Sequence, residues 1–316
     1  MRRAPYASSV ISLPNLSLLV LLSLSVQDSR PPGFKPPTSS SATAGTVSTL
    51  VPGALPEDAT AASRALWQAA CAAALAPGDE RRRADAFQLT FDIRTRRGRQ
   101  RNDVRARFLY LDAHGFIRTS LRRGREHVLG PSGPYLINGE ERIRLTKTRE
   151  HEQDLVQIEE TVSIARNFLA LTDPGSLRIA SLKTGEAPRG LPADVAARAA
   201  ALEWLDVRSP DFLLMRRSKL TKPGDLFRVR LGLHPETKRV EQAVIGDDSG
   251  PLANTTVLIE LQNLSPLDGF MVPGSIFVYD VDTAQRARTF VERPTLELVR
   301  VSGTLQPTLG PDDFRP

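Results

Sequence analysis

Few side chains of the sequence have the types and spacing that catalysis or metal binding requires. Its four histidines form no pair at the spacing of metal ligands, and an HExxH motif is absent. The acidic segment from Glu150 to Asp154 (EHEQD) forms the start of a predicted helix, where acids are typical of a solvated surface. A phosphate-binding loop and the GxSxG nucleophile motif are also absent. We therefore predict a protein that is not an enzyme and that has no cofactor and no bound metal.

One serine lies in a segment, GDDSGP (Gly246 to Pro251), that resembles the nucleophile loop of trypsin-like proteases. In that loop the serine follows an aspartate directly and two glycines come after it, so the spacing here is broken. No histidine motif precedes the segment, and such a serine needs a histidine as its base. Because Asp and Gly also favour turns, we expect a turn between two strands. An unrecognised hydrolase is the remaining catalytic alternative.

Arginines are crowded within residues 104–130, and the whole chain has 42 Lys and Arg against 36 Asp and Glu, a net charge of +6. In an ideal strand Arg105 and Arg107 lie on the face opposite Phe108 and Tyr110. Sheets that bind nucleic acid instead place exposed aromatic rings among their basic residues. We therefore predict a solvated outer face and no nucleic-acid partner. The alternative left open is that these arginines attract anionic lipid or a protein partner, with peripheral membrane contact.

The first residues have the pattern of a secretory signal peptide. Arg2 and Arg3 precede an apolar run from Leu16 to Val26, and Ser23 and Ser25 suit a signal peptidase. The run is too short for a stable transmembrane anchor. No cysteine follows it directly, so lipid attachment at a lipobox is not expected. We predict that the protein is exported to the periplasm.

Composition divides the chain into three predicted parts. Residues 1–25 are the signal peptide, and residues 26–56 are a Pro- and Ser-rich disordered linker, which has too few apolar side chains to order itself. Residues 57–316 form one domain, because no internal repeat and no clear boundary interrupts them.

Hydrophobic periodicity predicts an α+β fold with one strongly curved antiparallel sheet, an incomplete β-barrel whose concave face is covered by helices. Apolar residues alternate with polar ones in most of the predicted strands, and Gly or Pro separates neighbouring strands. The expected helices are residues 57–75, 150–171 and 193–205. The expected strands are residues 87–94, 104–111, 116–122, 126–129, 135–137, 143–145, 177–182, 227–233, 239–245, 255–262, 275–279 and 296–301.

The order of these elements resembles the LolA-like periplasmic lipoprotein carriers. The local matches are a run of strands and turns from Gly115 to Leu145, a late hairpin from Leu226 to Asn263, the strand VPGSIFVYD from Val272 and the closing LGPDDFRP from Leu309. The resemblance implies a half-barrel with an apolar cavity for the acyl chains of a lipid or lipoprotein. In such carriers an arginine beside a proline secures the lid, whereas this chain has DAHG (Asp112 to Gly115) at that place.

The resemblance also implies which residues line the cavity. The side chains that would line or support it are Phe87, Leu89, Phe91, Phe108, Tyr110, Phe227, Val229 and Leu231, and the helix with Leu155, Ile158 and Val162 would be the lid. The same residues would equally form a filled core. The alternative function is therefore an envelope scaffold or regulatory protein of the same fold, without cargo and with an envelope protein as partner.

Overall fold

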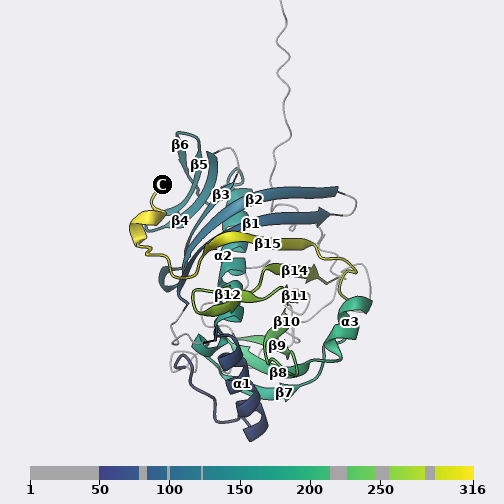
Figure 1. The fold of residues 1–316 in the computed structure, drawn as a ribbon. Helices are drawn as coiled ribbons and strands as arrows, with labels where there is room; N and C mark the ends of the chain where they lie inside the picture. Colours follow the sequence, from purple (N-terminus) through teal and green to yellow (C-terminus); the bar gives the residue numbers. More distant parts are fainter. Residues whose placement is uncertain are drawn as a thin grey trace, which may run out of the picture.

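A computed structural model describes residues 50–77, 84–97, 100–121, 124–213, 226–246, 256–281 and 289–316. Most of this part forms a single antiparallel sheet of 13 strands (Figure 1). The sheet begins at the edge strand β6 and ends at the edge strand β7 without closing on itself. The expected α+β class, with a curved open sheet and helices, is confirmed.

The long strands lie at the centre of the sheet, and consecutive strands are mostly neighbours. In sheet order the strands are β6 (Glu141–Arg144), β5 (Gly133–Asn138), β4 (Arg125–Gly130), β3 (Phe116–Leu121), β2 (Gln100–Leu111), β1 (Ala86–Arg97), β15 (Leu296–Thr304), β14 (Ser275–Asp280), β11 (Val257–Gln262), β10 (Val240–Gly246), β9 (Phe227–Leu233), β8 (Glu203–Ser209) and β7 (Ser181–Gly185). A short hairpin of β12 (Ser265–Leu267) and β13 (Phe270–Val272) forms a second sheet.

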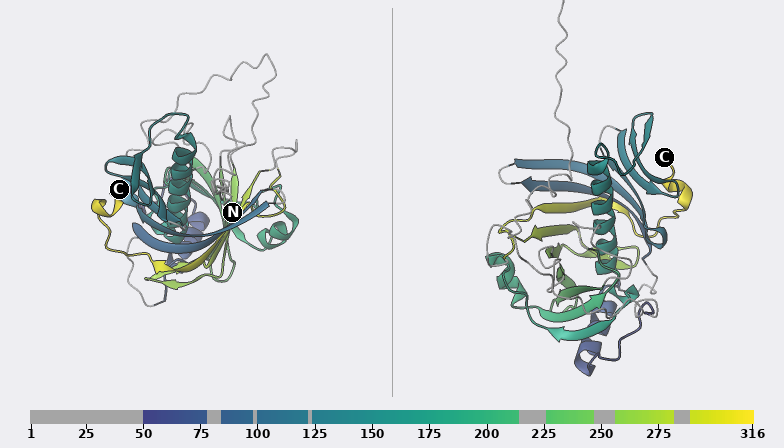
Figure 2. Two further views of the ribbon diagram at one scale, coloured as in Figure 1. Left: turned by 90° about the horizontal axis from the view of Figure 1, so that it is seen from above. Right: turned by 180° about the vertical axis from the view of Figure 1, so that it is seen from behind.

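Within the residue ranges given above, three α-helices pack against different parts of the sheet. The helix α1 (Ala61–Ala73) begins at Thr60, whose Oγ1 accepts a hydrogen bond from the backbone N–H of Ser63 at 3.2 Å, and it lies against β7. The long helix α2 (Glu152–Thr172) crosses the concave face, as Figure 2 shows from behind. The helix α3 (Ala193–Ala199) covers part of the opposite, outer face.

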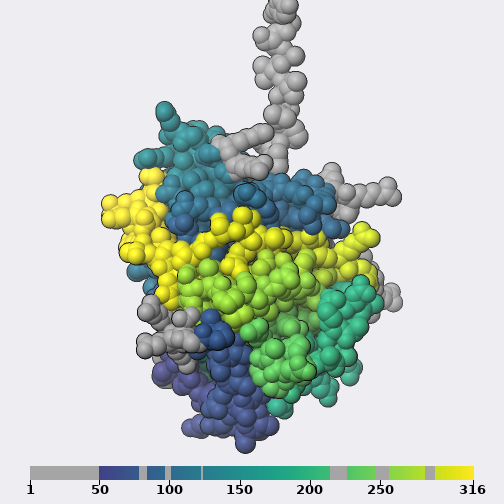
Figure 3. All heavy atoms as spheres, in the orientation of Figure 1, coloured from purple at the N-terminus to yellow at the C-terminus, as the bar shows by residue number. Residues whose placement is uncertain are grey.

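Apolar side chains pack on both faces of the sheet. The main cluster lies on the concave face, beneath α2. On the outer face Val195 of α3 packs with Val244, Leu258 and Phe290. A third cluster forms where Phe314, near the C-terminus, covers the outer face of β2, β4 and β5. Figure 3, which shows the face turned away from α2, shows this C-terminal segment (yellow) running past the strands.

The strand alternation expected for the arginine-rich stretch is confirmed. Phe108 and Tyr110 are buried, whereas Arg105 and Arg107 are exposed on the other face. Arg105 pairs with Asp92 on the neighbouring strand, with Nε to Oδ1 at 2.7 Å and Nη2 to Oδ2 at 2.8 Å. The aromatic rings and the arginines therefore lie on opposite sides of one strand.

Most predicted elements differ from the structure by a few residues at their ends, and two of the differences concern β7 and β8. The helix expected over residues 193–205 ends at Ala199, and the strand β8 begins at Glu203, because alanine-rich sequence continued a helical pattern up to the strand. The strand expected over residues 177–182 begins only at Ser181, after the short 3-10 helix Pro174–Ser176.

Part of the predicted organisation lies outside the described residues. The signal peptide, the linker up to residue 49 and most of the GDDSGP segment belong there. Within residues 50–56, the backbone N–H of Gly53 donates a hydrogen bond to the carbonyl of Leu177 at 2.9 Å. In the part of the chain that the structure describes, no helix is long and apolar enough to cross a membrane.

Candidate functional site

The candidate site is the apolar concave face of the sheet together with α2, which covers it. Phe168 of α2 lies between two aromatic rings of β1, with ring centroids 5.2 Å from Phe87 and 6.1 Å from Phe91. Both contacts have the edge-to-face geometry that aromatic pairs favour. Phe91 in turn contacts Phe108 of β2, at 5.7 Å. These four rings fix the second half of α2 on the centre of the sheet.

The buried side of α2 is partly polar. Gln157, Glu160, Thr161 and Asn167 are each 2–3% exposed, although a helix on an apolar sheet would ordinarily bury apolar side chains. Asn167 makes a double hydrogen bond with Leu213, since its Nδ2 donates to the backbone carbonyl and its Oδ1 accepts from the backbone N–H, both at 2.8 Å. Buried polar groups stabilise a helix less than apolar ones do, so α2 is bound to the sheet less strongly than its burial suggests.

The two ends of α2 are attached by ion pairs. Near its start, Asp154 Oδ1 lies 2.8 Å from His127 Nε2 and 2.8 Å from Arg125 Nη2, both residues of β4. The hydrogen bond with His127, and then the charges of both partners, lower the pKa of Asp154 despite its partial burial. Towards its end, Arg166 Nε donates to the backbone carbonyl of Asp211 at 3.1 Å. The helix is therefore secured by polar contacts at both ends and by Phe168 in its second half.

A cavity of about 20 Å³ lies between α2 and the concave face. A single water molecule needs roughly 10–15 Å³ of such space, so the closed cavity is too small for an acyl chain. Apart from Asn167 its lining is apolar. The lining residues are Ile164, Asn167, Phe168 and Leu171 of α2, together with Ile259, Leu261, Pro273, Ile276, Val278 and Leu298 from or beside β11, β14 and β15.

The structure brings the eleven predicted site residues together as one core. Nine of them are buried in the same apolar cluster: Phe87, Leu89, Phe91, Phe108, Tyr110, Ile158, Phe227, Val229 and Leu231. Leu155 and Val162 pack against this cluster and are partly exposed. None of the eleven belongs to the lining of the small apolar cavity.

The lining residues of β11, β14 and β15 lie in predicted strands, but the sequence pattern did not distinguish them from other strand residues. Ile259 and Leu261 alternate along β11, and Ile276 and Val278 alternate along β14. Their alternation predicts that each pair faces one side of the sheet. It does not predict that α2 lies over these strands, which was the missing information.

A more polar pocket of about 310 Å³ lies beside the second half of α2. Asp211 accepts hydrogen bonds there from the backbone N–H of Arg178 at 2.6 Å and from its Nε at 2.9 Å. The hydroxyl of Tyr110 donates to Asp112 at 3.0 Å, and burial, followed by the charge of Asp112, raises the pKa of this hydroxyl. The ring of Tyr110 thus lies in the apolar cluster, and its hydroxyl contacts Asp112, which lines this pocket.

The described residues contain no group of three or more His, Cys, Asp or Glu side chains arranged to hold a metal ion. In particular, His127 and His151 each contact a neighbouring segment through one ring nitrogen: His127 contacts Asp154, and His151 Nδ1 accepts from the backbone N–H of Thr146 at 3.1 Å. Both histidines therefore have a structural role, because each joins two neighbouring segments.

No family model and no curated protein matches the sequence. Three similar solved structures are a LolA superfamily protein from Nitrosomonas europaea (TM-score 0.42, 15% identity), a domain described as an outer membrane lipoprotein-sorting protein from Vibrio parahaemolyticus (0.43, 11%) and a DUF1329 family protein from Desulfovibrio piger (0.42, 11%). Each match covers 80% of this chain and 96–97% of the other.

Proposed function

We propose that the protein is an exported, non-catalytic carrier that binds the acyl chains of a lipid or lipoprotein on its concave face, beneath α2. The observation that supports this most directly is the apolar cavity between Phe168 and Val278. It marks a place where the helix and the sheet do not fill the space between them.

Binding of an acyl chain requires α2 to move away from β11 and β14. The polar side chains on the buried side of α2 favour such a movement, because Gln157 and Thr161 can hydrogen-bond to water when the helix lifts. The apolar side chains of the strands below, among them Ile259 and Val278, would then contact the chain instead of the helix.

The second candidate function is a scaffold or regulatory protein with a filled core and no cargo. The tight packing of the nine buried site residues and the small volume of the cavity support it. The two functions differ in whether a lipid is bound to the protein in its own envelope.

The test uses the full chain, purified from its own envelope and examined by native mass spectrometry. The carrier predicts co-purifying lipid at close to one per protein and saturable binding of a fluorescent fatty acid. A lipid-free protein that does not bind the probe would leave the scaffold as the function. Cleavage of residues 1–25 as a signal peptide is tested separately, by N-terminal sequencing of the mature protein from the periplasmic fraction.

A pair of matched variants locates the bound chain. Val278→Phe fills the cavity and should weaken binding of the probe, whereas Val299→Phe, at a side chain that is 42% exposed on β15, should leave it unchanged. Cooperative unfolding of both variants in urea shows that they are folded. Equal binding by the two folded variants would show that the chain does not lie beneath α2.

A further inference from the structure

A pocket of about 480 Å³ lies on the outer face of the sheet, on the opposite side from α2. Its floor is formed by outward-facing side chains of β8, β9 and β10, including Asp206, Arg230 and Val244. Its wall is the segment that runs from the end of β7 towards α3, residues 184–189. The backbone N–H of Phe290 donates to the carbonyl of Gly190 at 2.9 Å, and this bond fixes the far end of the wall over the sheet.

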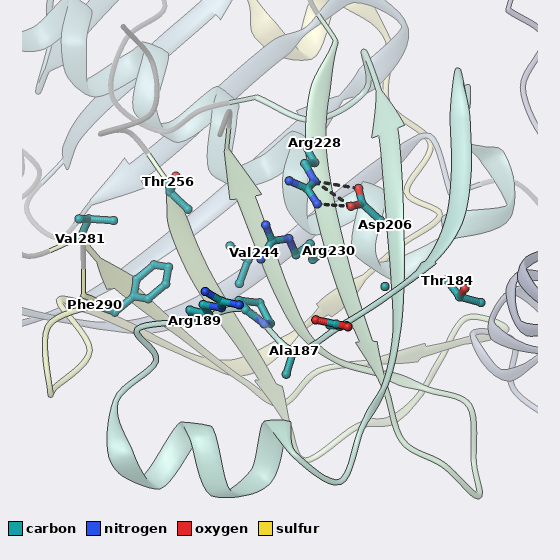
Figure 4. A pocket seen from close by; sticks show the side chains of 13 residues that line it. Thr184, Ala187, Arg189, Asp206, Arg228, Arg230, Val244, Thr256, Val281 and Phe290 are labelled. Carbon is teal, nitrogen blue, oxygen red and sulfur yellow. Dashed lines mark hydrogen bonds and ion pairs between the residues drawn. The ribbon is translucent and has the colours of Figure 1, made fainter. Parts of the chain in front are cut away.

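Three arginines from two separate elements line this pocket. Arg228 and Arg230 are two residues apart on β9, so their side chains leave the same face of the strand. Arg189 comes from the wall opposite them. Figure 4 shows the side chains of Arg189 and Arg230 extending toward each other across the pocket. The acidic residues among the described lining are Glu186 and Asp206.

Asp206 lies beside both arginines of β9 and hydrogen-bonds to Arg228. In the sheet register Asp206 lies directly opposite Arg230, yet its carboxylate accepts hydrogen bonds from Arg228, with Nε to Oδ2 at 2.8 Å (Figure 4). On its other side Arg230 is paired with Val244. Burial, and then the charge of Arg228, lower the pKa of Arg230.

The remainder of the pocket is apolar. Val244, Val281 and Phe290 form one side of it, next to the arginines. A volume of a few hundred Å³ that combines an apolar wall with a few placed charged groups is typical of a small-molecule site. Guanidinium groups form paired hydrogen bonds with the oxygens of carboxylates and phosphates.

We infer that this outer pocket binds a small organic anion, with a phosphate or carboxylate group against Arg189 and Arg230 and an apolar part against Val244 and Phe290. The site is separate from the concave face, so it does not depend on the proposed carrier function. It gives the protein a second ligand that differs from an acyl chain in both shape and charge.

The experiment is a titration of the full chain with phenyl phosphate and with benzoate, followed by ligand-observed NMR. Phenol and inorganic phosphate are the controls, because they correspond to the apolar half and the anionic half of phenyl phosphate. Both aromatic anions should bind, phenol should not, and inorganic phosphate should bind more weakly than phenyl phosphate. Arg230→Gln and Arg189→Gln should each weaken binding by about ten- to hundredfold, the effect of losing a hydrogen bond to a charged group. Arg189 is exposed on the wall, so its replacement should leave folding unchanged.

The matched control is Arg208→Gln, at an exposed residue of β8 that lies opposite Arg228 in the register and does not line the pocket. This variant should bind phenyl phosphate as the unmodified protein does. Equal loss in the Arg208 and Arg230 variants would overturn the inference, because it would indicate attraction by charge alone. Inorganic phosphate that binds as tightly as phenyl phosphate would also overturn it. So would probe binding that is lost in Val278→Phe but kept in Arg230→Gln, since the probe would then lie on the concave face.

Discussion

Asp154 of α2 and His127 of β4 lie in contact, with Oδ1 2.8 Å from Nε2, and this contact joins the first turn of the helix to the sheet. The His127 side chain is buried beneath the helix, at 2% exposure for the residue. Arg125, two residues earlier on the same strand, reaches the same carboxylate oxygen. One carboxylate thus connects α2 to two positions of β4.

This contact should make the free energy of unfolding depend on pH in the acidic range. The pKa of Asp154 is lowered in the folded protein, so its ionised form stabilises the fold above the unfolded value, about 3.9 for aspartate. That contribution is lost as the pH falls through the lowered pKa. Asp154→Asn should therefore reduce the free energy of unfolding by about 1–2 kcal/mol at neutral pH, and by progressively less below about pH 3.9.

The measurement is urea unfolding of both proteins across this range of pH. Asp92→Asn is the control, because Asp92 pairs with Arg105 on an exposed face, where ion pairs contribute about 0–1 kcal/mol. A difference between Asp154→Asn and the unmodified protein that stays constant down to the most acidic pH would contradict the assignment.

Phe168 should be among the side chains on which α2 depends most. It contacts Phe87 and Phe91 and also lines the cavity, so truncation removes the contacts and enlarges the empty space. Phe168→Ala should lower the free energy of unfolding by about 3–5 kcal/mol. Phe277→Ala, at a partly exposed ring of β14, should cost clearly less in the same urea titration. Equal losses would show that α2 is not fixed by Phe168.

The alternation of apolar and polar residues along the strands predicted most of this fold. Phe87, Leu89 and Phe91 alternate with polar residues, and the structure buries all three on the concave face. The sheet order of these strands also follows largely from the sequence, because consecutive antiparallel strands joined by short turns become neighbours. The strand β8 was missed because Trp204 and Leu205 follow an alanine-rich helix without a Gly or Pro between them.

The alternation of apolar and polar residues in the strands could not locate the candidate site. Its lining comes from α2 and from strands more than 80 positions further along the chain, such as Ile259 and Leu298, and no local pattern specifies which strands a helix crosses. The polar residues on the buried side of α2 obscured its orientation further, since Gln157 and Asn167 resemble solvated positions. The outer pocket was missed for a similar reason, because Arg189 joins Arg230 only when the chain after β7 folds back over the sheet.

Glu260 should stabilise the outer face through hydrogen bonds from three residues. It is 2% exposed, and its carboxylate accepts from Arg198 Nη2 at 2.8 Å, from the Tyr279 hydroxyl at 2.9 Å and from Gln242 Nε2 at 3.2 Å. Glu260→Gln removes the charge and one acceptor oxygen, and should cost about 1–3 kcal/mol in urea unfolding. Glu241→Gln, at a partly exposed carboxylate of the neighbouring strand, should change stability little. A larger loss in the Glu241 variant would contradict this account.

Gly303 should be intolerant of any side chain. It lies opposite Leu89 where β15 pairs with β1, beside an irregularity in the register, with a φ of +138°. A Cβ at this position would lie 2.1 Å from the carbonyl oxygen of Gln88, a distance at which the strands must separate. Gly115 is the matched control, because its φ is +61° and nothing lies within 4 Å of a Cβ built there.

Gly115→Ala should therefore show only the backbone cost, about 1–2 kcal/mol for an L residue in a left-handed conformation. Gly303→Ala should exceed it clearly in thermal or urea unfolding, because the central pairing of β1 with β15 must also yield. Hydrogen exchange locates the effect: amides of β1 and β15 should lose protection in Gly303→Ala and keep it in Gly115→Ala. Equal destabilisation by the two substitutions would mean that the close approach of Gln88 to Gly303 does not constrain the sheet.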